Sequence, residues 1–194
     1  MNRRLALRPR ADDGSGTFPP SQLVTSRLRL RRPRARDAAA VFDAYATDPE
    51  VTRYLAWRPH RTAEDSRDFL QQCEIAWETG IGHRAWVIER AEDRQLVGMI
   101  GVDVSPRGVD VGYVLSRAHW GRGYMTEALR AVCDAAFEDP TVHRVSGFCD
   151  VENRASARVM EKAGMQYEGT LRKYMRHVNV APGPRDCLLF ARVR

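Results

Sequence analysis

The stretch His119-Trp120-Gly121-Arg122-Gly123-Tyr124-Met125-Thr126-Glu127-Ala128-Leu129-Arg130 decides how the rest of the chain is interpreted. A strand-like apolar run over 109–115 precedes it, and apolar residues at helical spacing follow it. Glycines let a ligand approach the backbone closely, and the first turn of a helix offers unpaired N–H groups at the positive end of its dipole. The order of strand, glycine turn and helix therefore predicts a cradle for phosphate oxygens, and a plain glycine turn is the alternative.

A second segment of the same kind lies further along the chain. Asp150-Val151-Glu152-Asn153-Arg154-Ala155-Ser156 follows a strand-like run over 143–149 and begins another helix with apolar residues on one side. Asparagine is among the best residues for capping the start of a helix, so capping alone explains Asn153. A second strand-to-helix turn is therefore expected in this segment.

In this order and spacing the two segments closely resemble the GNAT superfamily of acyl-CoA-dependent N-acetyltransferases. Within it the chain is similar to the RimJ/RimL-like branch, whose founding members acetylate the N-termini of ribosomal proteins. The likeness runs from about Leu23 to the C-terminus. It rests on the run over 25–31, the W-G-x-G-x-x-T-E-A run, the E-N-x-x-S helix start and the E-G-x-L-R run over 168–172. Trp120 and Met125 depart from the broader Q/R-x-x-G-x-G/A pattern, which affects details of the cradle because backbone amides do the binding.

The pattern of elements predicts an α/β fold with a central mixed, mostly antiparallel sheet flanked by helices. A helix is expected over 63–79, with a capping-box-like start at Thr62 and an end at Gly80. The resemblance further implies that the fourth and fifth strands, 109–115 and 143–149, splay apart and that the pantetheine arm of acetyl-CoA lies in the opening. Residues 1–20 lack apolar periodicity and are expected to form a disordered leader, which leaves one N-acetyltransferase domain over 21–194.

Composition narrows the class of protein. Of 194 residues 43% are hydrophobic, and no apolar run approaches the ~20 residues of a membrane span. The N-terminus does not match a signal peptide, so we expect a cytoplasmic protein with no membrane partner. The four cysteines lack paired spacing, which predicts reduced thiols and no metal site. The net charge of +6 comes from dispersed arginines, which fits attraction for polyanionic coenzyme A and gives no reason to expect direct nucleic-acid binding.

The resemblance assigns the cofactor-binding residues. Backbone amides of the helix start would hold the pyrophosphate, strand backbone would pair with the pantetheine amides, and an asparagine amide would contact the cofactor arm. These residues are Arg122, Gly123, Tyr124, Met125 and Thr126 for the pyrophosphate, Val114 and Leu115 for the pantetheine, and Asn153 for the arm.

Acyl transfer to an amine requires a neutral amine, a stabilised carbonyl oxygen and a proton for the departing thiolate. Ser156 matches the serine that is proposed in this branch to protonate the thiolate, and its alternative is a plain polar residue in a first helical turn. Asp110 and Glu168 are the candidates for the general base. A carboxylate such as Glu127 favours the first turn of a helix, which explains it without catalysis.

The function expected from these residues is acetyl-CoA-dependent transfer of an acetyl group directly to a primary amine, either a protein N-terminal α-amine or a small-molecule amine. A non-catalytic CoA-sensing or protein-binding module on the same fold is the alternative. The identity of the acceptor and the acyl-chain preference stay open, as does assembly into a homodimer.

Overall fold

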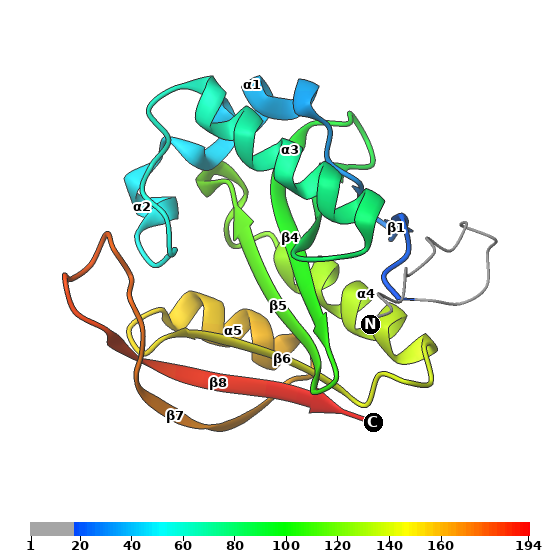
Figure 1. Cartoon of the computed structure of the whole chain (residues 1–194), viewed down its shortest axis with the longest axis vertical. Coiled ribbons are helices and arrows are strands. Elements are labelled where there is room, and N and C mark those ends of the chain that lie inside the picture. The colour runs from blue at the N-terminus through cyan, green and yellow to red at the C-terminus, as the bar shows by residue number, and fades with distance from the viewer. Residues whose placement is uncertain (1–17) are drawn as a thin grey trace, which may run out of the picture.

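The computed structural model describes residues 18–194, and its centre is an eight-stranded mixed sheet with helices on both faces (Figure 1). The strands run in the order β1-β2-β3-β4-β5-β6-β8-β7, and every neighbouring pair is antiparallel except β5 and β6. Their bounds are β1 Gln22–Val24, β2 Leu28–Arg31, β3 Arg84–Arg90, β4 Leu96–Ser105, β5 Gly108–Leu115, β6 Arg144–Asp150, β7 Gln166–Met175 and β8 Arg185–Val193. The predicted α/β architecture with a mostly antiparallel sheet is confirmed, and β1 is an edge strand that sequence analysis missed.

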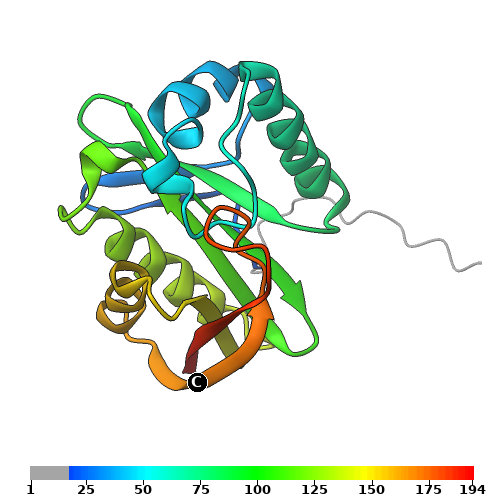
Figure 2. The ribbon, with the colours of Figure 1, turned by 90° about the vertical axis from the view of Figure 1, so that its left-hand side faces the viewer.

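The helices fall into two groups on opposite faces of the sheet (Figure 2). One group comprises η1 Ala35–Asp37, α1 Ala38–Val41, η2 Phe42–Ala46, α2 Pro49–Thr52 and α3 Ala63–Thr79. The other comprises α4 Tyr124–Glu138 and α5 Arg154–Lys162, and a short 3-10 turn, η3 Arg117–His119, precedes α4. Alternating strand residues supply both cores: Trp86 and Ile88 belong to the cluster that includes α4 and α5, while Ala85 and Val87 pack with α1 and α3. The period of two in β3 therefore builds a core on each face of the sheet.

The parallel pair β5 and β6 separates after a short contact. Only Val109↔Val145 and Asp110↔Ser146 are in register, so the rest of β5 has no partner in β6 (Figure 1). On its other side β5 pairs with β4 over its whole length. The predicted splay of these two strands is confirmed, and it leaves one edge of β5 available at the centre of the sheet.

Local sequence signals fix the ends of several helices. In α3 the Thr62 hydroxyl accepts from the Asp65 amide, the Asp65 carboxylate accepts from the Thr62 amide, and Gly80 ends the helix with φ at 69°. Both predicted ends of this helix are confirmed. The preceding helical segment ends at Ala46, Asp48 is extended, and Pro49 then begins α2 behind the Asp48 cap, because proline is tolerated at the first helical position.

The described chain begins inside the expected leader. Phe18 is buried against Trp86, with ring centroids 6.4 Å apart, and its amide donates to the Asp139 carboxylate at 3.2 Å. The Trp86 indole also donates to the Pro20 carbonyl at 3.0 Å. The packed domain therefore includes residues 18–20, and the expected boundary at residue 21 lies slightly too late because one aromatic residue carries no periodicity. The remainder of the expected leader, residues 1–17, lies outside the described part of the chain.

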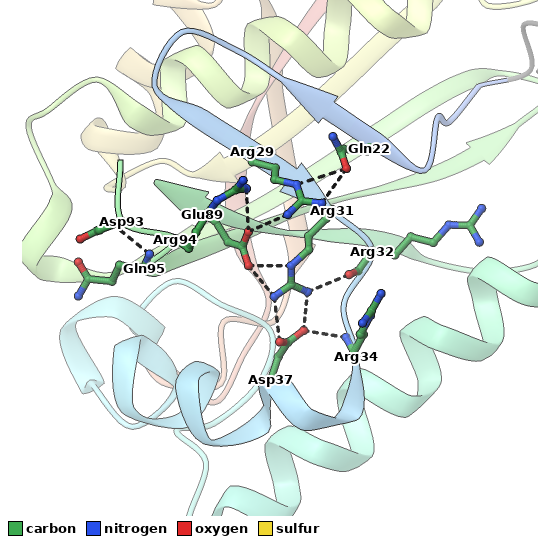
Figure 3. Close-up of polar contacts among 10 residues, drawn as sticks. All are labelled: Gln22, Arg29, Arg31, Arg32, Arg34, Asp37, Glu89, Asp93, Arg94 and Gln95. Atoms are coloured by element: carbon green, nitrogen blue, oxygen red, sulfur yellow. Dashed lines mark hydrogen bonds and ion pairs between the residues drawn. The ribbon is translucent and has the colours of Figure 1, made fainter. Parts of the chain in front are cut away.

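A charged network holds the start of the helical layer against the sheet (Figure 3). The Arg31 guanidinium of β2 donates to both oxygens of Asp37 at 2.8 and 2.9 Å and to Glu89 of β3 at 2.7 Å. Asp37 also accepts from the Arg34 amide at 2.8 Å. Both carboxylates are buried, and each accepts hydrogen bonds from the Arg31 guanidinium, so the cost of removing these charges from water is offset by charge-assisted hydrogen bonds. The network connects β2, β3 and η1.

The described residues were also compared with the expectations for membrane helices, cysteines and metal ligands. Among residues 18–194 no helix is long and apolar enough to cross a membrane. All four cysteines are free and buried, and the described residues contain no cluster of side chains that would hold a metal ion.

Candidate active site

A groove of about 890 Å³ follows the divergence of β5 from β6, a volume within the usual range for a small-molecule site. Its walls come from the end of β5, the turn before α4, the first turns of α4 and α5, and the region around α2. Two segments that sequence analysis singled out, 119–130 and 150–156, therefore meet across one cavity. The region around α2 was not expected there.

The turn before α4 has the geometry of an anion cradle. Gly121 and Gly123 adopt left-handed φ values of 74° and 77°, which L-residues with a side chain rarely take, and α4 begins directly at Tyr124. Gly123, Tyr124, Met125 and Thr126 all line the groove, so the free N–H groups of the first helical turn border it. The fifth predicted residue, Arg122, is absent from the groove lining.

Arg27 completes the cradle, and sequence analysis did not single it out. Its guanidinium donates to the Arg122 carbonyl at 3.0 Å and to the Glu127 carboxylate at 2.6 Å, and it lies 4.8 Å from the centre of the Tyr124 ring. Glu127 also accepts from the Thr25 hydroxyl at 2.6 Å. Burial opposes ionisation of Glu127, but these hydrogen bonds outweigh it and lower its pKa. Glu127 therefore fixes a cation beside the cradle, a structural role beyond the helix-start preference that explained it in the sequence.

The wall between α4 and α5 is cationic. Arg130, Arg154, Arg158 and Lys162 line the groove, and none of them forms an ion pair with a carboxylate of residues 18–194. Other arginines, such as Arg144 and the Arg31 of Figure 3, are paired with carboxylates. Four unpaired cations beside a turn of free amides suit a ligand that carries several phosphates.

The open edge of β5 faces this cavity. Val114 and Leu115, the predicted pantetheine-pairing residues, both line the groove beyond the point where β6 leaves the strand. The Trp120 indole donates to the Leu115 carbonyl at 2.8 Å and so fixes the turn against the strand end. Backbone groups of a strand edge without a partner strand are ready to pair with amides of an extended ligand.

The start of α5 places Asn153 and Ser156 on the same groove. The Asn153 side-chain oxygen accepts from the Ser156 amide at 3.1 Å, so the capping role that the sequence suggested is confirmed. The Ser156 hydroxyl lies 2.8 Å from the Tyr113 hydroxyl, which also donates to the Ser156 carbonyl at 3.1 Å. Tyr113 was not predicted, although the Gly112-Tyr113 pair directly before the expected pantetheine strand marks its position.

The two base candidates lie outside the groove. Asp110 sits where β5 still pairs with β6, and its carboxylate accepts from the Ser146 hydroxyl at 2.5 Å. Glu168 on β7 pairs with Arg144, whose hydrogen bonds lower the pKa of this carboxyl. Neither residue is among those that line the cavity. Spacing along the sequence does not show which face or which end of a strand a carboxylate occupies. Asp110 lies at the end where β5 and β6 are still paired.

The region around α2 forms the remaining wall, with Glu50, Val51, Arg53, Tyr54 and Leu55 on the groove. The loop after β7 holds this region in place, because the Asn179 amide donates to the Thr52 and Trp57 carbonyls at 2.8 and 2.7 Å. Glu152 also lines the groove and pairs with Arg185 at 3.0 Å. The Asn179 contacts join segments more than a hundred residues apart, so no local pattern indicates them.

Comparison with known proteins agrees with this geometry. The model of the acetyltransferase (GNAT) domain family matches residues 27–166. The Bacillus subtilis N-acetyltransferase YoaA is 33% identical over 156 residues, which cover 79% of this chain and 87% of that protein. A GNAT-family acetyltransferase from Bacillus anthracis is 28% identical with a TM-score of 0.76, covering 89% of this chain and 98% of that one. The microcin C7 self-immunity acetyltransferase MccE, solved with acetyl-CoA and AMP, shares the fold at 21% identity and a TM-score of 0.80, covering 94% and 100%.

The chain therefore belongs to the GNAT acetyltransferase family and is an N-acetyltransferase. Acetyl-CoA is its acyl donor. The glycine turn, the cationic wall and the open strand edge fit the phosphates and the extended arm of that donor.

Proposed function

We propose that the enzyme transfers acetyl from acetyl-CoA, held along the groove between β5 and β6, directly to a primary amine with a low pKa. The observation that carries the proposal is the meeting of three parts on one cavity: the amide cradle before α4, the open edge of β5 and the capped start of α5. Each part suits one portion of the donor, and their order along the groove runs from phosphates to thioester.

The residues divide the work as follows. Backbone amides from Gly123 to Thr126 hold the pyrophosphate, and Arg27 adds a positive charge beside them. Backbone of Val114 and Leu115 pairs with the pantetheine amides and presents an N–H group to the thioester oxygen as it gains charge. Asn153 caps α5 and sets the place of Ser156, whose hydroxyl gives a proton to the departing sulfur.

The choice of acceptor follows from the carboxylates. Of those on the groove, Glu127 is held by Arg27 and Glu152 by Arg185, which leaves Glu50 without an ion pair in the described part of the chain. With so little base available, the acceptor must itself supply neutral amine. A peptide α-amine has a pKa of about 7.7–8.0 and meets this condition near neutral pH, whereas a lysine side chain at about 10.4 does not.

Solved structures of the same fold are consistent with a peptide acceptor. The RimL ribosomal L7/L12 α-N-protein acetyltransferase, solved with coenzyme A, superimposes with a TM-score of 0.76 at 20% identity. At that identity the likeness concerns the fold alone, so the preference for an α-amine rests on the carboxylates of this chain.

The acceptor is tested with two matched peptides, one with a free N-terminus and a blocked lysine, the other with the reverse. We expect faster thiol release from acetyl-CoA with the free N-terminus. Faster modification of the lysine peptide would contradict the proposed acceptor. Absence of turnover with a broad panel of amines, including peptides, small amines and polyamines, would contradict direct transfer to a primary amine.

A further inference from the structure

The Tyr113 hydroxyl is a polar group on the groove to which the roles above assign nothing. Tyr113 comes from β5, and its ring packs beside the core cluster that includes α4 and α5, so the side chain is half-buried with its hydroxyl at the start of α5. Burial raises the pKa of Tyr113, and the hydrogen bond with Ser156 opposes this only in part. The phenol is therefore protonated near neutral pH and carries one hydrogen that it can donate.

The geometry gives this donor two acceptors on one residue. The Tyr113 oxygen lies 2.8 Å from the Ser156 Oγ and 3.1 Å from the Ser156 carbonyl oxygen. The Asn153 cap fixes the Ser156 amide at the same time, so backbone and side chain of this serine are both held. A serine hydroxyl in a helix is otherwise free to rotate or to bond back to the preceding turn. A donor at its oxygen restricts where its own hydrogen can point.

We propose that Tyr113 is a positioning residue for acyl transfer, donating a hydrogen bond to the Ser156 Oγ so that the serine hydrogen faces the thioester sulfur. The inference rests on the proposed function, because it presumes that Ser156 serves the leaving group. A neutral serine is a weak acid, and a hydrogen bond received at its oxygen strengthens it as a donor, since linked hydrogen bonds polarise one another.

The balance of the step is simple. The nitrogen–carbon bond to the acceptor forms, the carbon–sulfur bond breaks, and the bonding electron pair remains on sulfur. Sulfur takes the Ser156 hydrogen while the Tyr113 hydrogen bond stabilises the charge that develops on Oγ. The proton that the acceptor nitrogen loses returns through water to Oγ. Tyr113 is unchanged at the end, and no other reactant is needed.

A purely structural role would look different in experiment. The ring of Tyr113 packs against the core, and a phenylalanine would keep this packing while removing the hydroxyl that contacts Ser156. If the hydroxyl only ties β5 to α5, its loss lowers the melting temperature and leaves the rates unchanged. If it positions the serine, its loss lowers kcat while the KM for acetyl-CoA stays the same.

The test compares Tyr113→Phe, Ser156→Ala and the double variant, with Tyr167→Phe as control. Tyr167 lies on β7 outside the groove, and its hydroxyl also contacts a hydroxyl, that of Thr170, at 2.9 Å. We expect Tyr113→Phe to lower kcat about tenfold with an acetyl-CoA KM within about twofold of wild type, the scale of one hydrogen bond made stronger in the transition state. The double variant should be no slower than Ser156→Ala, because the two hydroxyls act as one unit.

An unchanged kcat in Tyr113→Phe, or a double variant whose loss equals the product of the single losses, would overturn the inference. Placing 3-fluorotyrosine at position 113 keeps the donor and should retain kcat within about twofold, so a loss of rate there as large as in Tyr113→Phe would also count against it. Coenzyme A titrations of each variant confirm a folded groove. If the wild-type enzyme shows no acetyl transfer to amines, the proposed function fails, which is a separate result.

Discussion

Replacing Gly123 with glutamate should weaken coenzyme A binding more than a hundredfold, through both backbone strain and charge repulsion. Gly123 has φ at 77°, and a Cβ built there meets only a flexible atom, the Arg27 Nη2, at 3.5 Å. The strain of a left-handed residue is about 1–2 kcal/mol and affects folding. A carboxylate about 5 Å from one pyrophosphate charge costs about 3 kcal/mol at an effective dielectric constant of about 20, which corresponds to a Kd raised more than a hundredfold.

Two further variants separate charge from strain. Gly80→Glu introduces the same residue at a φ of 69° in a position equally free of neighbouring atoms, but at the end of α3, away from the groove. Gly123→Gln keeps the bulk and the strain of the glutamate without its charge. Calorimetric titration with coenzyme A should give wild-type affinity for Gly80→Glu, a moderate loss for Gly123→Gln and the large loss for Gly123→Glu, while melting temperatures fall similarly in all three.

The order of these three affinities tests whether the phosphates lie at the start of α4. Wild-type affinity in Gly123→Glu would refute this placement, because no phosphate could then lie at the start of α4. Equal losses in Gly123→Glu and Gly80→Glu would refute the electrostatic reasoning, since the effect would then come from the fold. Raising ionic strength should weaken binding to the wild-type groove, as expected for phosphates among unpaired cations.

Two other predictions concern stability. Deleting residues 1–20 should lower the melting temperature by about 5–10 °C relative to deleting residues 1–17. Only the longer deletion removes the buried Phe18, whose side chain stabilises the fold by about 3 kcal/mol. Equal melting temperatures would show that Phe18 contributes nothing. Asp37→Ala should cost about 2 kcal/mol, measured by urea unfolding, because it removes both charge-assisted hydrogen bonds from the Arg31 guanidinium to Asp37. An unchanged midpoint would mean that the network in Figure 3 is energetically neutral.

The parts of the fold that the sequence predicts are those set by local rules. Thr62 with Asp65 three residues later and the glycine after the helix delimit α3 correctly, because capping depends only on neighbours along the chain. β1 and α2 were missed because they are three and four residues long, too short for a period to register. Phe18 was missed because its burial depends on Trp86, far away in sequence.

In the candidate site, too, the predictable parts are those set by local sequence. The turn before α4 and the start of α5 are helix starts, where glycine and asparagine leave a local signal, and the structure brings both segments to one groove. Arg27 and Tyr113 act through contacts with residues 100 and 43 positions away, so their roles exist only once β2, β5, α4 and α5 are packed. The base candidate Asp110 shows the limit of a motif. This carboxylate fits the motif position two residues before Gly112, but it lies where β5 and β6 are paired and not on the groove. A motif thus identifies turns whose backbone suits a ligand. The packing of distant segments decides which side chains lie on the groove. Because the Tyr113 hydroxyl reaches Ser156 only when β5 and α5 are packed together, its contribution to the rate is the first of these contacts to measure.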